Sequence, residues 1–265
     1  MASYALQLGD EEVRRYRAMA QTAVAAERDY WEAAGINRGA AVADVGCGPG
    51  AVSALLAEMV GHEGRVWAID ADPQAVQRVA TLAAGAGLSN VEAVVGDAAA
   101  TGLPVGQLDV AMLRHVLAHN GGREQAIVNH LANLVQPGGC VYLVDVDGTA
   151  VRIRPKNRDL EDLYERYEEF HRRRDNDISV GLRLDDLLHN AGLDLVNFTG
   201  RYDIGKAAPC LRGPAWAARE AIMEAGLATP ADVARWSAAF ERADSRPDRP
   251  TLFIPMFVAI GRTPT

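Results

Sequence analysis

The hydrophobic pattern of the chain alternates between short apolar runs and longer stretches in which apolar residues recur at three- and four-residue spacing. Runs of the first kind indicate strands, and stretches of the second kind indicate helices with one buried face. The predicted strands of the first half are residues 41–46, 65–70, 91–95, 108–113 and 140–146. This alternation predicts an α/β fold with a doubly wound, mostly parallel sheet.

An amphipathic helix is predicted ahead of the first strand. Asp10 is a candidate N-cap, and Gly35 provides the C-terminal stop. The apolar positions between them recur at helical spacing and include Val13, Tyr16, Ala20, Ala23, Val24, Tyr30 and Trp31. We therefore expect the N-terminal residues to form a helical cap.

The pattern becomes charge-rich after Asp147. Residues 151–175 hold eight basic and seven acidic residues, which is too balanced for a basic patch. Within this segment one helical face is apolar and aromatic, while oppositely charged residues four apart occupy the other face. The inner face consists of Leu160, Leu163, Tyr164, Tyr167, Phe170 and His171.

Two more strands are predicted near the C-terminus. A helix over residues 182–188 precedes a sixth strand, residues 193–205, and an alanine-rich helical stretch follows it. The last strand, residues 251–262, returns after this long excursion. Pro255 inside that strand indicates a bulge or a kink, because proline has no N–H to donate.

Composition narrows the class of protein. The 265 residues are 49% hydrophobic and 23% charged, which is typical of one globular domain. The net charge of −8 argues against nucleic acid or an anionic membrane as a partner, since both require a basic face. Within this domain we expect a helical cap (1–35), a ligand-binding core (36–150), an insertion after the fifth strand (151–180) and the rest of the sheet (181–265).

The cysteines and the N-terminal residues indicate in which cellular compartment the protein is expected. The three cysteines, Cys47, Cys140 and Cys210, are too few and too scattered for a disulfide framework or a zinc site, and we expect no metal. The N-terminus lacks the apolar region of a secretion signal, and no apolar run approaches roughly eighteen residues. We therefore expect a soluble cytoplasmic protein and leave a homodimer open.

The most informative stretch is AVADVGCGPG, residues 41–50. Glycines at alternate positions after a strand let a ligand approach the bare backbone, and the following helix directs free N–H groups at it. Asp70 ends the next predicted strand, where a carboxylate can bind the hydroxyls of a ribose. A dinucleotide site shares these features, but a buried carboxylate at Asp44 would favour a cationic ligand or an ammonium group.

Five segments in this order resemble class I S-adenosylmethionine-dependent methyltransferases, and the similarity extends over residues 33–147. They are AVADVGCGPG, AIDADP, VVGDAA, LDVAMLRHVLAH and QPGGCVYLVD. The small-molecule branch typified by ubiquinone and menaquinone biosynthesis is the most similar. Ala75 and Val76 depart from a frequent Met-Leu pair of that branch, and Gln136 replaces a frequent Lys. The resemblance implies a seven-stranded Rossmann-like fold with an antiparallel last strand. It also implies S-adenosylmethionine as cofactor and S-adenosylhomocysteine as product.

The resemblance also implies roles for single residues at the cofactor. The three glycines would surround the methionine half, Asp70 would bind the ribose, and Asp97 would accept from the adenine amino group. The alternative for Asp97 is a turn or helix-capping residue. N-terminal helices of the family cap the cofactor pocket, so Tyr16 and Met19 are candidates for this lid, with simple packing on the sheet as the alternative. The candidate cofactor-binding residues are Asp44, Gly46, Gly48, Gly50, Asp70, Ala71, Asp97, Ala98, Arg114 and Tyr16.

Candidate residues for a catalytic base and for binding the methyl acceptor lie after the fourth predicted strand and on the charge-rich helix within residues 151–175. His115 and His119 come after that strand, and imidazole titrates near neutrality, so either is a candidate catalytic base. No base is needed when the nucleophile is a carbon or a neutral amine, so O-, N- and C-methylation stay open. The candidate acceptor-binding residues are Tyr164, Tyr167, Phe170 and His171, with ordinary packing as the alternative.

The leading hypothesis is therefore a cytoplasmic methyltransferase acting on a small aromatic or polyketide-like metabolite. An NAD(P)-dependent oxidoreductase is one alternative, because it shares the glycine loop and the ribose carboxylate. A non-catalytic protein that binds adenosylmethionine is the other.

Overall fold

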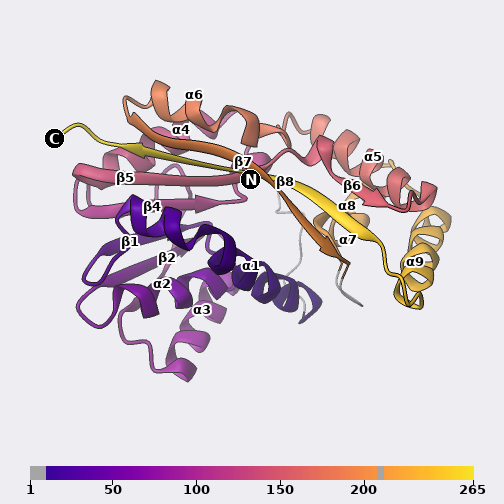
Figure 1. Cartoon of the computed structure of the whole chain (residues 1–265), viewed down its shortest axis with the longest axis horizontal. Coiled ribbons are helices and arrows are strands. Elements are labelled where there is room, and N and C mark those ends of the chain that lie inside the picture. Colours follow the sequence, from indigo (N-terminus) through magenta and orange to yellow (C-terminus); the bar gives the residue numbers. More distant parts are fainter. Residues whose placement is uncertain (1–9, 208–211) are drawn as a thin grey trace.

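The structure, a computed structural model, describes residues 10–207 and 212–265 (Figure 1). The first part contains α1 (Asp10–Ala34), β1 (Ala41–Val45), α2 (Ala51–Val60), β2 (Arg65–Asp70), α3 (Pro73–Ala86), β3 (Val91–Val95), β4 (Leu108–Arg114), η1 (Leu117–His119), α4 (Glu124–Leu134) and β5 (Val135–Val146). The second part contains η2 (Gly148–Ala150), β6 (Arg152–Arg154), α5 (Arg158–Arg172), η3 (Val180–Arg183), α6 (Leu184–Asn190), β7 (Asp194–Lys206), α7 (Pro214–Ala217), α8 (Arg219–Glu224), α9 (Pro230–Asp244) and β8 (Thr251–Arg262).

One sheet organises the molecule. Its strand order is β3-β2-β1-β4-β5-β8, with β7 paired to β8 along the other edge of that strand. Strands β1 to β5 are parallel, and β8 runs antiparallel to β5 and β7. The predicted doubly wound, seven-stranded sheet is confirmed. The described residues add the three-residue strand β6, which pairs with β8 beyond the end of β5.

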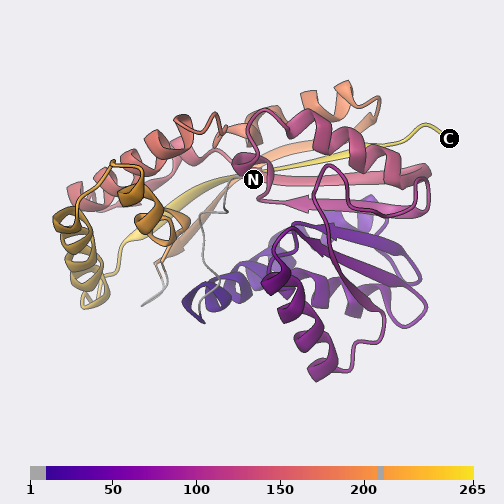
Figure 2. The ribbon, with the colours of Figure 1, turned by 180° about the vertical axis from the view of Figure 1, so that it is seen from behind.

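Helices cover both faces of the sheet, because alternate residues of each strand are buried on opposite sides. Val42, Val66 and Val110 pack with α1 and α2, whereas Ala43 and Ala111 pack with α4 and α6. Figures 1 and 2 show these two pairs of helices on opposite sides of the sheet. Burial on both faces explains why the core strands are continuous apolar runs in the sequence.

The start of β5 and the pairing at Pro255 differ from the sequence prediction. Strand β5 begins at Val135, before the Pro-Gly-Gly turn, and the pairing with β4 shifts register between Leu108 and Val110 to accommodate the extra residues. Of the bulge or kink expected at Pro255, the bulge is wrong, because pairing with β7 continues through this residue without a shift in register, while the kink stays a prediction. Pro255 instead lies where β8 changes partner from β5 to β6, and the irregularity of β7 lies between Leu195 and Asn197.

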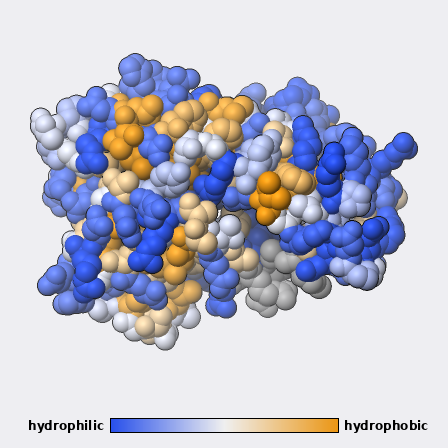
Figure 3. Space-filling model, viewed as in Figure 1, coloured by the Kyte–Doolittle hydropathy of each residue, from blue (hydrophilic) through white to orange (hydrophobic). Residues whose placement is uncertain are grey.

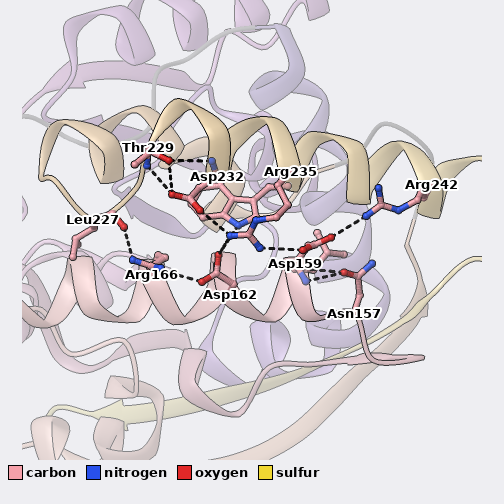
Figure 4. Close-up of polar contacts among 11 residues, drawn as sticks. Asn157, Asp159, Asp162, Arg166, Leu227, Thr229, Asp232, Arg235 and Arg242 are labelled. Atoms are coloured by element: carbon pink, nitrogen blue, oxygen red, sulfur yellow. Dashed lines mark hydrogen bonds and ion pairs between the residues drawn. The ribbon is translucent and has the colours of Figure 1, made fainter.

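A layer of helices forms the other end of the molecule, away from β1 to β4 (Figures 1 and 2). Helix α5 packs there against α7, α8 and α9 through a separate hydrophobic cluster around Trp236, which is fully buried. The outer faces of α5 and α9 are polar (Figure 3). Arg235 on α9 bridges Asp159 and Asp162 of α5 at 3.0 and 2.6 Å (Figure 4).

Candidate functional site

The glycine loop connects β1 to α2 at the carboxyl edge of the sheet. Gly46, Gly48 and Gly50 have φ of 71°, 53° and 82°, the left-handed region that L residues rarely adopt. Space is also restricted, because a Cβ on Gly50 would lie 2.9 Å from a methyl carbon of Val79, and one on Gly46 would overlap Val116. Backbone conformation and close packing therefore both require glycine in this loop.

Asp70 holds the loop from the end of the neighbouring strand. Its Oδ2 accepts a hydrogen bond from the Gly48 N–H at 2.9 Å, and its Oδ1 accepts from the Asp72 N–H at 2.9 Å. Burial raises the pKa of Asp70, while these two hydrogen bonds oppose the shift. Each carboxylate oxygen can accept more than one hydrogen bond, so Asp70 is fixed in place and still able to bind ligand hydroxyls.

Asp44 is the second carboxylate of the loop and is only 3% exposed. The Ser53 hydroxyl on α2 donates to its Oδ2 at 2.6 Å. Burial raises the pKa of Asp44 to about 6, against the Ser53 hydrogen bond and the charge of Arg114. Ser53 was not among the residues predicted for the site, although a serine on the buried face of an apolar helix is a signal for such a partner.

Helix α1 contacts the glycine loop through Tyr16. Two ring carbons of Tyr16 lie 3.1 and 3.3 Å from the position that a Cβ on Gly48 would take. The structure thus brings Tyr16 to the glycine loop, where a cofactor-binding residue was predicted. Met19, the second candidate on this helix, accepts a hydrogen bond through its sulfur from Arg15.

Arg114 forms a buried ion pair with Glu27 of α1. Its Nε and Nη2 donate to the two oxygens of Glu27 at 3.1 and 2.7 Å. The Tyr142 hydroxyl and the Trp31 indole also donate to Glu27, and Arg201 of β7 lies 3.6 Å away. No local sequence signal pointed to Glu27, whose partner is 87 residues away. In the described structure Arg114 ties α1 to the sheet, and its contact with a cofactor stays a prediction.

Asp97 lies after β3 at the same edge of the sheet. Its Oδ1 accepts from the Ala99 N–H at 2.8 Å and from the guanidinium of Arg123. Partial burial acts to raise the pKa of Asp97, but the hydrogen bonds from Arg123 and Ala99 outweigh it and lower this pKa. This geometry is that of a turn aspartate, so a bond to adenine stays a prediction. Ala98 is partly buried beside it, and Ala71 is exposed.

The candidate histidines have low pKa values. Burial lowers the pKa of His119 to about 4 and that of His115 well below its usual value, with cations such as Arg15 adding to both shifts. Both imidazoles are therefore neutral at pH 7, and a base with a pKa near 4 accepts a proton weakly. His115 has a φ of 56° at the end of β4, where the chain turns into η1.

Residues on the aromatic face of α5 contact two different parts of the molecule, the helices α7 to α9 and the segment after β4. Tyr167 and Phe170 are 7% and 2% exposed and belong to the cluster with α7, α8 and α9. The Tyr164 hydroxyl lies 3.0 Å from the position of a Cβ on Gly213, while His171 faces His119 with ring centroids 5.0 Å apart. Packing accounts for the burial of Tyr167 and Phe170, and an acceptor-binding role for the four residues stays a prediction.

Cysteine and metal chemistry add little to this site. Cys47 within the glycine loop and Cys140 on β5 are free, and Cys210 lies outside the described residues. In residues 10–207 and 212–265 no three histidine, cysteine or acidic side chains are grouped so that they could hold a metal ion. Nor does any helix in these ranges have the length and apolar character needed to cross a membrane.

Residues 42–139, which contain β1 to β4 and the glycine loop, match the family model described as a methyltransferase domain. Over 66 residues, 25% of this chain, the sequence is 41% identical to the protein-L-isoaspartate O-methyltransferase of Ignicoccus hospitalis, of which the match covers 31%. The chain spans about a third of the length of the curated relatives it matches.

Solved structures with the same arrangement extend the comparison beyond this domain. A candidate methyltransferase of Bacillus halodurans C-125 is similar with a TM-score of 0.61 and 20% identity, covering 91% of this chain and 100% of that one. The phosphoethanolamine N-methyltransferase 2 of Haemonchus contortus, solved with S-adenosyl-L-methionine, has a TM-score of 0.59 and 13% identity, covering 98% of this chain and 58% of that one. At these identities the likeness establishes the Rossmann-like methyltransferase fold.

Proposed function

We propose that this chain, whose residues 42–139 are a methyltransferase domain, transfers a methyl group from S-adenosylmethionine to a small molecule. One observation carries the proposal: the buried carboxylate of Asp44 and the partly buried carboxylate of Asp70 flank the glycine loop and together give it a negative field. Such a field favours a ligand with an ammonium and a sulfonium group. Asp44 would repel the pyrophosphate of a dinucleotide, whereas Asp70 is compatible with the ribose of either ligand.

The chain's own residues supply binding and orientation. The glycine loop admits the ligand to bare backbone, and Asp70 binds the ribose hydroxyls while its contacts to Gly48 and Asp72 keep it in place. When bound, S-adenosylmethionine supplies a methyl group already activated by a positively charged sulfur. The protein therefore needs mainly to position the nucleophile and exclude water, which is the role we assign to α1 and α5.

The acceptor in this proposal is a small aromatic or polyketide-like metabolite, of the kind that the small-molecule branch of the family methylates. The net charge of −8 supports a small acceptor over a nucleic acid. His171 supports an aromatic acceptor, because its ring comes from α5 and faces His119 in the segment after β4. The methylated atom is left as O, N or C.

Calorimetric titration of the purified protein with S-adenosylmethionine, S-adenosylhomocysteine and NADH tests the cofactor. We expect both adenosyl ligands to bind and NADH not to bind. Tight NADH binding without adenosylmethionine binding would replace the proposal with an oxidoreductase. Binding of both adenosyl ligands without methyl transfer to any acceptor in extracts or metabolite panels would favour a non-catalytic binding protein.

A further inference from the structure

His171 lies at the C-terminal end of α5 and is only 2% exposed. Its ring is enclosed by other rings, with centroid distances of 4.4 Å to Tyr167, 5.3 Å to Phe170 and 5.0 Å to His119. Burial lowers the pKa of His171 to about 3, with His119 and Arg174 adding to the shift. A neutral imidazole has one donor and one acceptor nitrogen, so its chemistry depends on which nitrogen holds the hydrogen.

The side chain of Asn176 decides this question. The backbone N–H of Gly121 donates to Asn176 Oδ1 at 3.0 Å, which identifies that atom as the amide oxygen. The other amide atom, Nδ2, is therefore the NH₂ group, and it lies 2.9 Å from Nδ1 of His171. Because an NH₂ group only donates, His171 Nδ1 must accept, and the hydrogen of the neutral ring is on Nε2.

This orientation of Asn176 is held on both sides. The Asn176 backbone N–H donates to the carbonyl oxygen of His171 at 3.0 Å, which closes the turn after α5. Gly121 packs so tightly against the Asp175 backbone that a Cβ there would overlap it. The segment after β4 and the end of α5 are thus held together. A half-turn of the His171 ring would break the hydrogen bond between its Nδ1 and Asn176.

The Nε2–H group of His171 is buried and has no hydrogen-bond partner among the described residues. Buried donors in native proteins are almost always paired, and leaving one unpaired is costly. The positive charge of Arg174 acts on His171 and favours a partner with negative character. A buried donor that has no partner and lies near a positive charge indicates that a bound molecule supplies an oxygen to it.

We infer that His171 Nε2–H donates a hydrogen bond to a carbonyl, carboxylate or phenolate oxygen of the methyl acceptor. This inference rests on the proposed function and names the acceptor class: a molecule that presents an oxygen with partial or full negative charge at the end of α5. The same tautomer excludes His171 as the base that deprotonates the acceptor, because its accepting nitrogen is already occupied by Asn176. His171 is thus a substrate-binding residue.

Nitrogen-15 NMR of histidine-labelled protein tests the tautomer directly. The chain has six histidines, and the spectrum of His171→Phe assigns the signal of His171. We expect a protonated Nε2 and an unprotonated Nδ1 at pH 7 in the wild-type protein. The opposite tautomer, or a charged ring, overturns the inference.

Benzoate, phenol and toluene serve as probes of the missing partner. We expect benzoate and phenol to shift the His171 Nε2–H resonance while toluene, which has the same ring but no oxygen, leaves it unchanged. His171→Phe should weaken benzoate binding on the order of tenfold, and His171→Gln, whose amide nitrogen can reach the Nε2 position, should weaken it roughly threefold or less. Equal effects of the two variants, or no response to either oxygen probe, reject the acceptor oxygen.

Adenosylmethionine titrations on the same preparations separate the two proposals. A protein that binds adenosylmethionine but has the wrong tautomer or ignores the oxygen probes leaves the proposed function intact and overturns only the role of His171. A protein with the expected tautomer and probe response that does not bind adenosylmethionine overturns the proposed function instead.

Discussion

The two ends of the site are built in different ways. At the cofactor end, the loop from Gly46 to Gly50 and the two carboxylates Asp44 and Asp70 lie within a single βαβ unit, and backbone groups make most of the contacts. At the proposed acceptor end, groups from α1, the segment after β4 and α5 lie close together. The first end therefore depends on backbone conformation, and the second on the packing of distant segments.

This contrast predicts which measurement each substitution changes. Changes at the cofactor end should weaken ligand binding and leave the folded state largely intact. Changes at the proposed acceptor end should mainly lower the free energy of unfolding, because they remove contacts that hold α1, α5 and α9 in place. Four substitutions test this distinction, each with a matched control.

Gly48→Val should have the largest effect, because a branched side chain enters the loop where the cofactor backbone would lie. We expect adenosylmethionine binding to fall by more than about a thousandfold, or ~4 kcal/mol. The matched control is Gly102→Val, since Gly102 also has a positive φ, 81°, but no atom lies within 4 Å of the position that its Cβ would take. The positive φ alone should cost each variant about 1–2 kcal/mol of stability, and Gly48→Val should lose more because its Cβ also meets the Tyr16 ring. Equal binding by the two variants would show that the loop does not contact the ligand.

Glu27→Ala should destabilise the fold more than any exposed substitution, because it leaves the buried Arg114 guanidinium without its carboxylate. Removing one member of a buried pair costs about 3–5 kcal/mol. Glu32→Ala on the same helix removes an exposed ion pair with Arg28 and should cost less than about 0.5 kcal/mol. Urea unfolding measures both, and similar losses would mean that the Glu27 network does not anchor α1.

Asp70→Ala should weaken adenosylmethionine binding by about ten- to a hundredfold, because charge-assisted hydrogen bonds to the ribose contribute roughly 1.5–3 kcal/mol. Asp72→Ala is the control, since Asp72 caps α3 through the Gln74 N–H at 2.9 Å. Its loss should cost about 1 kcal/mol of stability and leave the affinity nearly unchanged. Calorimetry and thermal unfolding on both variants separate the two roles, and an unaltered dissociation constant for Asp70→Ala would remove it from the ribose.

Arg235→Ala should have the smallest effect of the series. Arg235 is 40% exposed and bridges Asp159, Asp162 and Asp232 between α5 and α9. Solvent and salt screen such pairs, so we expect a loss of no more than about 1 kcal/mol that shrinks in high salt. The pair of Lys156 with Glu161, 4.0 Å apart, is more exposed, and Lys156→Ala should show no measurable change. A loss for Arg235→Ala that is independent of salt would indicate packing instead of charge.

Local sequence signals identified the core of the fold. The glycine spacing, the carboxylate at the end of the second strand and the continuous apolar runs all lie within one structural unit, so each is visible in a short window. The Pro-Gly-Gly segment shows the limit of such signals. It was expected to precede the fifth strand. It belongs to β5 instead, because Val135 pairs with Leu108 of β4 and Gly139 packs beside the Asp109 carbonyl.

Periodicity and glycine conformation act over a few residues, so the sequence alone was enough to predict the doubly wound sheet and the position of the glycine loop. The partner of Arg114 and the tautomer of His171 became visible only in the folded chain. Glu27 lies 87 residues from Arg114, and Gly121 lies 55 residues from Asn176. Contacts at such separations depend on how whole helices pack against the sheet, and no local pattern of residue types specifies that packing.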